Sequence, residues 1–180
     1  MTDTHRPQAA PCGTWTSPIS AAVVAAGAMP LSQLALDGSD VLWLAGRASE
    51  AGRTTLQRLR GDATTPAELT PAPFNVRSRV HEYGGGAYAA AGGTVWFSHF
   101  ADNHLYAVEG GGEPVMITRE EQVRYADFVP DRARNRLVAV REDHLAGAAY
   151  PVNTICAVGF DGKETILVEG NDFYAAPRLS

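Results

Sequence analysis

The chain has 180 residues, of which 45% are hydrophobic and 19% are charged, and its formal net charge is −5. This low and mixed charge excludes a disordered acidic chain, and the lack of a basic excess argues against a nucleic-acid partner. No apolar run approaches the roughly 20 residues that span a bilayer, and the polar first eleven residues do not form a signal peptide. We therefore expect a globular cytoplasmic protein without a membrane partner.

Metal and cofactor signatures are weak. Cys12 and Cys156 lack the spacing of metal ligands, so we expect two reduced thiols. His99 and His104 flank a polar turn with no third ligand nearby, which favours a hairpin turn over a metal site. The glycine pattern over 84–89 precedes a strand pattern rather than opening a helix, unlike a dinucleotide-binding motif. We predict no metal and no cofactor.

The N-terminal region consists of a flexible tail over 1–13 and a helical lead-in over 14–30. Ser17 can cap a helix and Pro18 suits the first helical position. Gly27 fits the position just after a helix end. The sequence predicts one short helix over 18–26.

After Pro30 the pattern changes to short strands separated by turns, and Asp37-Gly38 is a strong hairpin signal. Four short strands then recur as a unit. The units cover residues 31–70, 84–118 and 124–169, and residues 171–180 look like the first strand of a further unit. A period of about 40–50 residues with four strands is typical of β-propeller blades.

A single four-stranded sheet leaves both faces uncovered, and usually four to eight blades must close a ring. About three blades and the start of a fourth cannot close. We therefore predict an all-β fold, an incomplete β-propeller preceded by a short helix. A β-sandwich of this length is the alternative.

The densest polar cluster lies between the first two units, in Arg77-Ser-Arg79-Val-His81-Glu82-Tyr83-Gly84-Gly85-Gly86. The two guanidinium groups can bind carboxylates, and His81 and Glu82 have ionisable side chains. The three glycines allow a sharp turn into the next strand. The loop either lines a pocket or an interface, or is a solvated connection between blades with a glycine hinge.

Two further polar stretches lie within or directly after the third unit. Residues 169–174 hold Asp172 and Tyr174 in a linker that leads into a blade, like the first cluster. The alternative is an Asx turn beside aromatic residues that pack between blades. Residues 141–144 are expected to join the second and third strands of their unit and to form ion pairs at the surface.

Several stretches resemble bacterial peptidases of the prolyl oligopeptidase family, in the acylaminoacyl-peptidase and dipeptidyl-aminopeptidase branch. The stretches are Trp15-Thr-Ser-Pro-Ile-Ser20, Thr70-Pro-Ala-Pro-Phe-Asn-Val-Arg77, Arg79-Val-His-Glu-Tyr-Gly-Gly-Gly86, Arg124-Tyr-Ala-Asp127, Arg141-Glu-Asp-His144 and Glu169-Gly-Asn-Asp-Phe-Tyr174. The resemblance covers nearly the whole chain after about residue 11.

The resemblance implies an N-terminal β-propeller followed by an α/β-hydrolase domain with a Ser-Asp-His triad. In such enzymes the propeller caps the active site and filters peptides by size. This chain contains no Gly-x-Ser-x-Gly nucleophile motif, so we expect the hydrolase domain to be absent from it. No catalytic residue is assigned, and no catalysis is expected from this chain alone.

The sequence thus predicts the N-terminal propeller segment of a serine peptidase, which gates and orients peptide substrate for the hydrolase domain. The candidate substrate-binding or gating residues are Arg79, His81, Glu82, Tyr83, Asp172 and Tyr174. Glu82 is expected to pair with a substrate amino group, and Arg79 to hold Glu82. The alternative function is a non-catalytic propeller-like binding module, completed by self-association through open blade edges.

Overall fold

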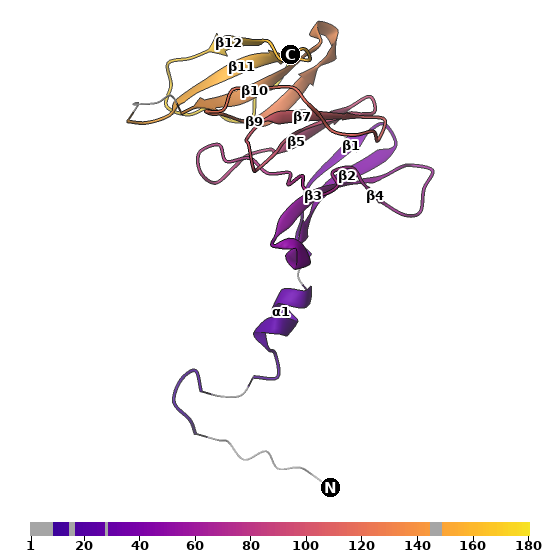
Figure 1. The fold of residues 1–180 in the computed structure, drawn as a ribbon, viewed down its shortest axis with the longest axis vertical. Helices are drawn as coiled ribbons and strands as arrows, with labels where there is room; N and C mark the ends of the chain where they lie inside the picture. Colours follow the sequence, from indigo (N-terminus) through magenta and orange to yellow (C-terminus); the bar gives the residue numbers. More distant parts are fainter. Residues whose placement is uncertain (1–8, 15–16, 28, 145–148) are drawn as a thin grey trace.

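The fold was analysed in a computed structural model, which describes residues 9–14, 17–27, 29–144 and 149–180. It contains three four-stranded antiparallel sheets (Figure 1), so the all-β prediction with units of four strands is confirmed. The first sheet comprises β1 (Leu31–Asp37), β2 (Asp40–Arg47), β3 (Arg53–Leu59) and β4 (Ala67–Glu68). The second comprises β5 (Tyr88–Ala91), β6 (Thr94–Ser98), β7 (Leu105–Glu109) and β8 (Val115–Met116). The third comprises β9 (Val123–Asp131), β10 (Arg136–Asp143), β11 (Val152–Gly159) and β12 (Glu164–Val168).

The strands of each sheet follow one another in sequence order, as in successive propeller blades. Strands β1, β5 and β9 open the three sheets, and β5 contacts both β1 and β9. Two short 3₁₀ turns, Ala48–Glu50 and Arg132–Arg134, occur within the connections of the first and third sheets. The strands of each sheet form a meander, and the first strands of neighbouring sheets lie side by side. A β-sandwich instead has two sheets packed face to face, so the alternative fold does not fit.

The helix α1 (Ala21–Gly27) begins three residues later than predicted. The Oγ of Ser20 accepts a hydrogen bond from the N–H of Val23 at 3.1 Å, so Ser20 rather than Ser17 caps the helix. Ser17 instead accepts a hydrogen bond from the N–H of Ile19 in the preceding turn. In Figure 1, α1 lies apart from the sheets. No helix in the described ranges is long and apolar enough to cross a membrane.

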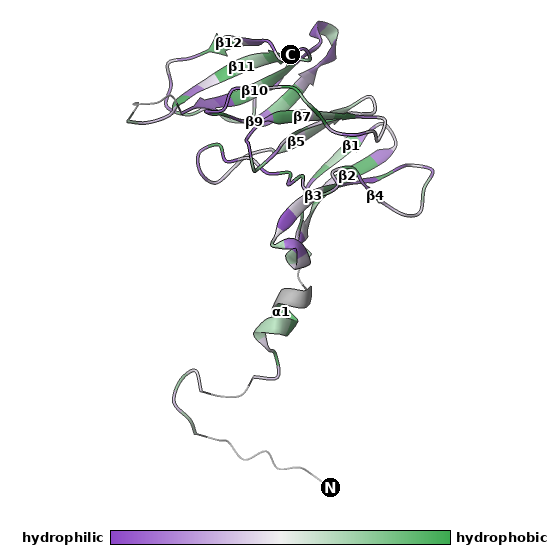
Figure 2. Cartoon of the chain, in the orientation of Figure 1, coloured by the Kyte–Doolittle hydropathy of each residue, from purple (hydrophilic) through white to green (hydrophobic). Residues whose placement is uncertain are grey.

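The middle sheet is covered on both faces because successive side chains of a strand point to opposite sides. On β6, Val95 and Phe97 pack with Leu42 and Leu56 of the first sheet. Between them, Trp96 points the other way and packs with the third sheet. Figure 2 shows the apolar residues gathered on the strands and the hydrophilic residues in many of the turns.

The first strands of two sheets carry the same irregularity, which the strand pattern did not predict. The register of β1 shifts around Gln33, and the register of β9 shifts around Asp127. Both residues have positive φ angles, 50° and 54°. At each shift the side chain forms hydrogen bonds with the backbone of the segment just before β5. The Gln33 amide donates to the carbonyl oxygen of Gly85 and accepts the N–H of Ala87. The Asp127 carboxylate accepts the N–H of Gly86. The two bulges thus link neighbouring sheets at their first strands.

Residues 171–180 form no strand, in contrast to the strand predicted there. The segment is still tied to the third sheet, because the N–H of Ala176 donates to the second carboxylate oxygen of Asp127 at 3.0 Å. A first strand needs a paired second strand to form a ladder, and this segment has none in the described part of the chain.

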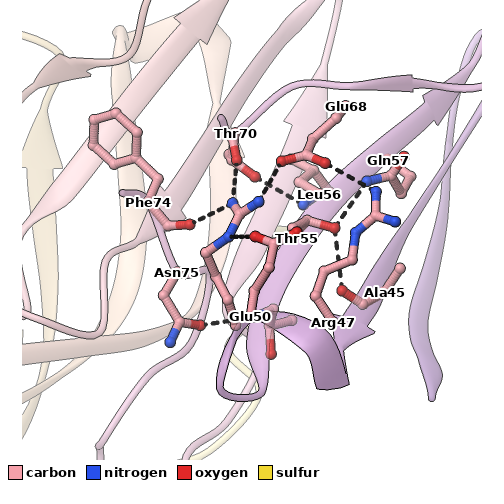
Figure 3. Close-up of polar contacts among 12 residues, drawn as sticks. Ala45, Arg47, Glu50, Thr55, Leu56, Gln57, Glu68, Thr70, Phe74 and Asn75 are labelled. Atoms are coloured by element: carbon pink, nitrogen blue, oxygen red, sulfur yellow. Dashed lines mark hydrogen bonds and ion pairs between the residues drawn. The ribbon is translucent and has the colours of Figure 1, made fainter. Parts of the chain in front are cut away.

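The connection from the first sheet to the second is held by Arg53, at the start of β3. Its partners Glu50, Glu68, Thr70 and Phe74 are labelled in Figure 3. Its guanidinium donates to the carbonyl oxygens of Thr70 and Phe74 at 2.8 and 2.9 Å. It also pairs with Glu68 at 2.8 Å and with Glu50 at 2.6 Å. Only 12% of the Arg53 side chain is exposed, so these bonds satisfy a nearly buried cation.

The pKa of Glu68 should make this connection sensitive to acid. Burial on its own would raise the pKa, but hydrogen bonds and charge interactions with Arg53 and Arg47 lower it below the ordinary value of 4.5. A lowered folded-state pKa contributes stability above the unfolded-state pKa, and this contribution is lost as the pH falls through the folded value. We expect Glu68→Gln to lower the free energy of unfolding at pH 7 by about 1–3 kcal/mol. The variant should also lose less stability than the parent as the pH falls below about 5.

Urea unfolding at several pH values measures both effects. Asp62→Asn is the matched control, because its ion pair with Arg60 is exposed and should contribute little. A Glu68→Gln profile that runs parallel to the parent between about pH 5 and 3 would contradict this account.

Candidate functional site

Two polar linkers, far apart in sequence, converge at one end of the third sheet. From the loop over 77–86, Val80 packs with Ala126 and Val140, and Tyr174 of the second linker packs against the same cluster. The ring centre of His81 lies 5.1 Å from that of Phe173 in an edge-to-face arrangement. The two predicted clusters therefore form one site, which we call the linker site.

The loop holds its polar side chains in a strained backbone. His81 and Glu82 have φ angles of 55° and 66°, and non-glycine residues in this region cost on the order of 1–3 kcal/mol each. The N–H of Glu82 donates to the carbonyl of Arg79 at 2.9 Å, which closes the turn. Gly84 follows at φ 88°, and a Cβ there would lie 2.9 Å from the carbonyl oxygen of Ser78, so the position requires glycine.

Arg124 of β9 fastens this turn to the sheet. Its Nη1 donates to the carbonyl oxygen of Arg79 at 2.9 Å and to the Oε1 of Glu82 at 2.7 Å. The same nitrogen lies 3.4 Å from the Oε1 of Glu142 on β10. One guanidinium therefore bridges the backbone of the loop, an exposed carboxylate and a buried carboxylate.

Glu142 is the buried anchor of the linker site, with 1% of the residue exposed. Its Oε2 accepts the N–H of His81 at 2.8 Å, and its Oε1 lies 2.6 Å from the Nε2 of His144. The expectation that residues 141–144 join two strands as a surface pair was wrong for Glu142. The second strand of the unit runs on to Asp143, and alternation places Glu142 on the same side of β10 as the buried Val140.

Arg124, rather than Arg79, holds Glu82. The hydrogen bond and the positive charge of Arg124 lower the pKa of Glu82, which keeps this carboxylate ionised. Arg79 instead lies over the ring of Phe100, 4.1 Å from its centre, and Arg77 approaches the same ring at 4.7 Å. These two arginines thus make cation–π contacts on the second sheet.

The remaining candidates surround Glu82 or lie on the second linker. The Nε2 of His81 lies 3.0 Å from the Oδ1 of Asn153, at the start of β11. Tyr83 is exposed, with its ring centre 5.8 Å from that of His81. Asp172 lines a cavity beside Asn153. The hydroxyl of Tyr174 accepts hydrogen bonds from the backbone N–H and the side-chain amide of Asn171.

The chemistry of this arrangement is that of binding. An ionised, largely exposed carboxylate on a rigid turn can pair with an ammonium group, and the neighbouring rings provide apolar surface. Sequence reasoning did not identify Arg124, Glu142 and Asn153. The signal for Glu142 was the alternation Val138, Val140, Glu142, which continues the buried face of the strand past its apolar residues.

Several solved peptidase structures are similar to this chain over most of its length. A puromycin-hydrolysing peptidase of Mycobacterium tuberculosis superimposes with a TM-score of 0.80 and 37% sequence identity, over 92% of this chain and 28% of that chain. A puromycin hydrolase gives 0.74 and 36%, over 85% of this chain and 25% of the other. The resemblance to the prolyl oligopeptidase family is confirmed. A second structure of a puromycin hydrolase, complexed with PGG, gives 0.78 and 34%, over 89% and 27%.

The chain thus spans about a quarter of the length of these peptidases, and it corresponds to a propeller portion of the family. Neither a family model nor a curated protein matches it. The linker site lies within this propeller portion, since the contacts of Val80, His81 and Glu82 described above join the first linker to the third sheet.

The buried position of Glu142 generates a prediction. Glu142→Ala leaves Arg124 and the N–H of His81 without their carboxylate, and removing one partner of a buried ion pair costs about 3–5 kcal/mol. We expect a loss of stability of that order, together with faster hydrogen exchange at the His81 amide, because the strained turn loses its anchor. Glu121→Gln, at an exposed position just before β9, is the control and should change neither quantity.

Urea unfolding and amide exchange measured by NMR provide the two readouts. The anchor role is refuted if the His81 amide of the Glu142→Ala protein exchanges as slowly as that of the parent under conditions where both remain folded.

Proposed function

We propose that this chain is the propeller segment of a cytoplasmic serine peptidase that hydrolyses short peptides. In that protein the propeller limits access to the active site and orients the amino terminus of the substrate. The chemical step is assigned to an α/β-hydrolase domain, because the chain itself lacks a Gly-x-Ser-x-Gly motif. The similarity to puromycin-hydrolysing peptidases over 85–92% of the chain supports the proposal.

The observation that carries the proposal is the exposure of Glu82 together with its contact to Arg124. Its side chain is 78% exposed, yet one oxygen is fixed at 2.7 Å from Arg124. Among the described residues the other oxygen accepts no hydrogen bond, and a charge-assisted hydrogen bond to a substrate ammonium suits it. His81 and Tyr83 are the chain neighbours of Glu82, and Arg79 is the first residue of the turn that Glu82 closes.

The second linker extends the same surface. Asp172 adds a carboxylate beside the cavity, and Tyr174 supports the linker through the cluster with Val80. Both carboxylates favour a positively charged amino terminus over a blocked one. A peptide or amide with a free amino group is the substrate class that fits, and puromycin is a first compound to test because the similar peptidases hydrolyse it.

The test uses the protein that contains this chain together with its hydrolase domain. We expect Glu82→Gln to raise KM about 3- to 10-fold for peptides with a free amino terminus, with little change in kcat, because an exposed charge pair contributes about 1 kcal/mol. N-acetylated peptides should be unaffected. Glu113→Gln, in an exposed turn between β7 and β8, is the matched control. Unchanged kcat/KM for free short peptides would contradict the proposed role of Glu82.

A non-catalytic module completed by self-association is the second candidate, favoured by an apolar strand. Leu31, Leu34 and Leu36 of β1 are 64%, 74% and 70% exposed. Exposed leucines along a sheet edge promote association with another chain. If this function holds, the chain should form a stable symmetric oligomer in size-exclusion chromatography with light scattering, and Leu34→Glu should dissociate it. A monomer at micromolar concentration speaks against the module.

A further inference from the structure

A cavity of about 640 Å³ opens beside the linker site, between the start of β11 and the segment after β12. Tyr150, Val152 and Asn153 line one side, and Asp172 and Phe173 line the other. Its volume lies within the range of about 300–1,000 Å³ that is typical of small-molecule sites. The candidate residues of the sequence touch this cavity only through Asp172, and its remaining walls have no assigned role.

Two large rings border the cavity without being packed. Tyr150 is 83% exposed and Phe173 is 68% exposed, whereas the aromatic residues of the sheets, such as Phe97, are buried. Aromatic rings pack on other rings in preferred geometries, and such pairs contribute free energy beyond that of the buried area. The cavity wall therefore includes two exposed aromatic rings.

His81 connects the cavity to the carboxylate of the loop. Its ring packs edge-to-face on Phe173, and its Nε2 lies 3.0 Å from the Oδ1 of Asn153. Glu82 follows His81 directly in the chain and keeps an exposed, ionised carboxylate. His81, the chain neighbour of Glu82, thus contacts two residues of the cavity wall, Phe173 and Asn153.

The charge at the cavity indicates which class of side chain it disfavours. Asp172 forms no ion pair with the described residues, and it lines the cavity. Asp172 therefore adds a negative charge to the cavity wall. An acidic side chain entering the cavity would meet this like charge at a cost.

We propose that this cavity is a side-chain subsite for an aromatic, non-acidic residue of the peptide whose amino terminus Glu82 holds. The inference rests on the proposed function and adds the side-chain class of the substrate. Tyr150 and Phe173 receive the ring, His81 links the subsite to Glu82, and Asp172 disfavours acidic residues.

The test measures binding of amino-acid amides to the 180-residue chain by ligand-observed NMR. We expect L-phenylalanine amide to bind about tenfold more tightly than L-alanine amide, from burial of the ring, and L-aspartic acid amide to bind more weakly than either. Phe173→Ala and Tyr150→Ala should remove the preference for phenylalanine and leave the affinity for alanine amide unchanged. Asp172→Asn should reduce the discrimination against the aspartic acid amide, and the exposed Asp62→Asn is the control for a charge change elsewhere.

Glu82→Gln separates the two proposals. It should weaken phenylalanine and alanine amides by the same factor, because it removes the contact to the amino group and not the subsite. If Glu82→Gln leaves the affinity for both amides unchanged while the phenylalanine preference persists, the subsite stands and the proposed role of Glu82 falls. Equal affinity for the two amides, a preference unaffected by Phe173→Ala, or no binding of either amide to the folded chain overturns the subsite.

Discussion

The requirement that both faces of each sheet be covered governs this molecule. A four-stranded sheet buries one face against one neighbour, and its other face then needs a second neighbour. The middle sheet meets this condition on β6, where Val95 and Phe97 face the first sheet and Trp96 faces the third. The positions of the linkers follow from that stacking, because it brings β1, β5 and β9 side by side and places the linkers between sheets at their ends.

The bulges at Gln33 and Asp127 show how stacked sheets are also joined by polar contacts. Each bulge turns one side chain out of the ladder and toward backbone groups of the glycine segment before β5. Asp127 holds Gly86 with one oxygen and Ala176 with the other. The end of the loop that carries Glu82 is therefore fixed by the same residue that fixes the segment after β12, and the two linkers are coupled through the third sheet.

The linker site combines strain with burial. His81 and Glu82 occupy unfavourable backbone conformations, and the compensation comes from a buried carboxylate that accepts the His81 amide and shares Arg124 with Glu82. A buried charge is tolerated only when it is paired and hydrogen-bonded, and Glu142 meets that condition through Arg124, His144 and His81. The result is an exposed carboxylate held by Arg124, an arrangement that suits the proposed recognition of a substrate amino group.

The sequence by itself determined the strand-rich class, the units of four strands, the Asp37-Gly38 hairpin and the loop that bears Glu82. Period-2 alternation and turn residues are local patterns, so they can be recognised from the sequence without a structure. Only the tertiary structure decided that Ser20 caps the helix, that Glu142 is an anchor rather than a surface charge, and that Arg124 rather than Arg79 holds Glu82. The convergence of His81 with Phe173 likewise depends on which sheet faces which linker. These contacts join residues distant in sequence, and their pairing is set by the stacking of the sheets, which no local pattern encodes.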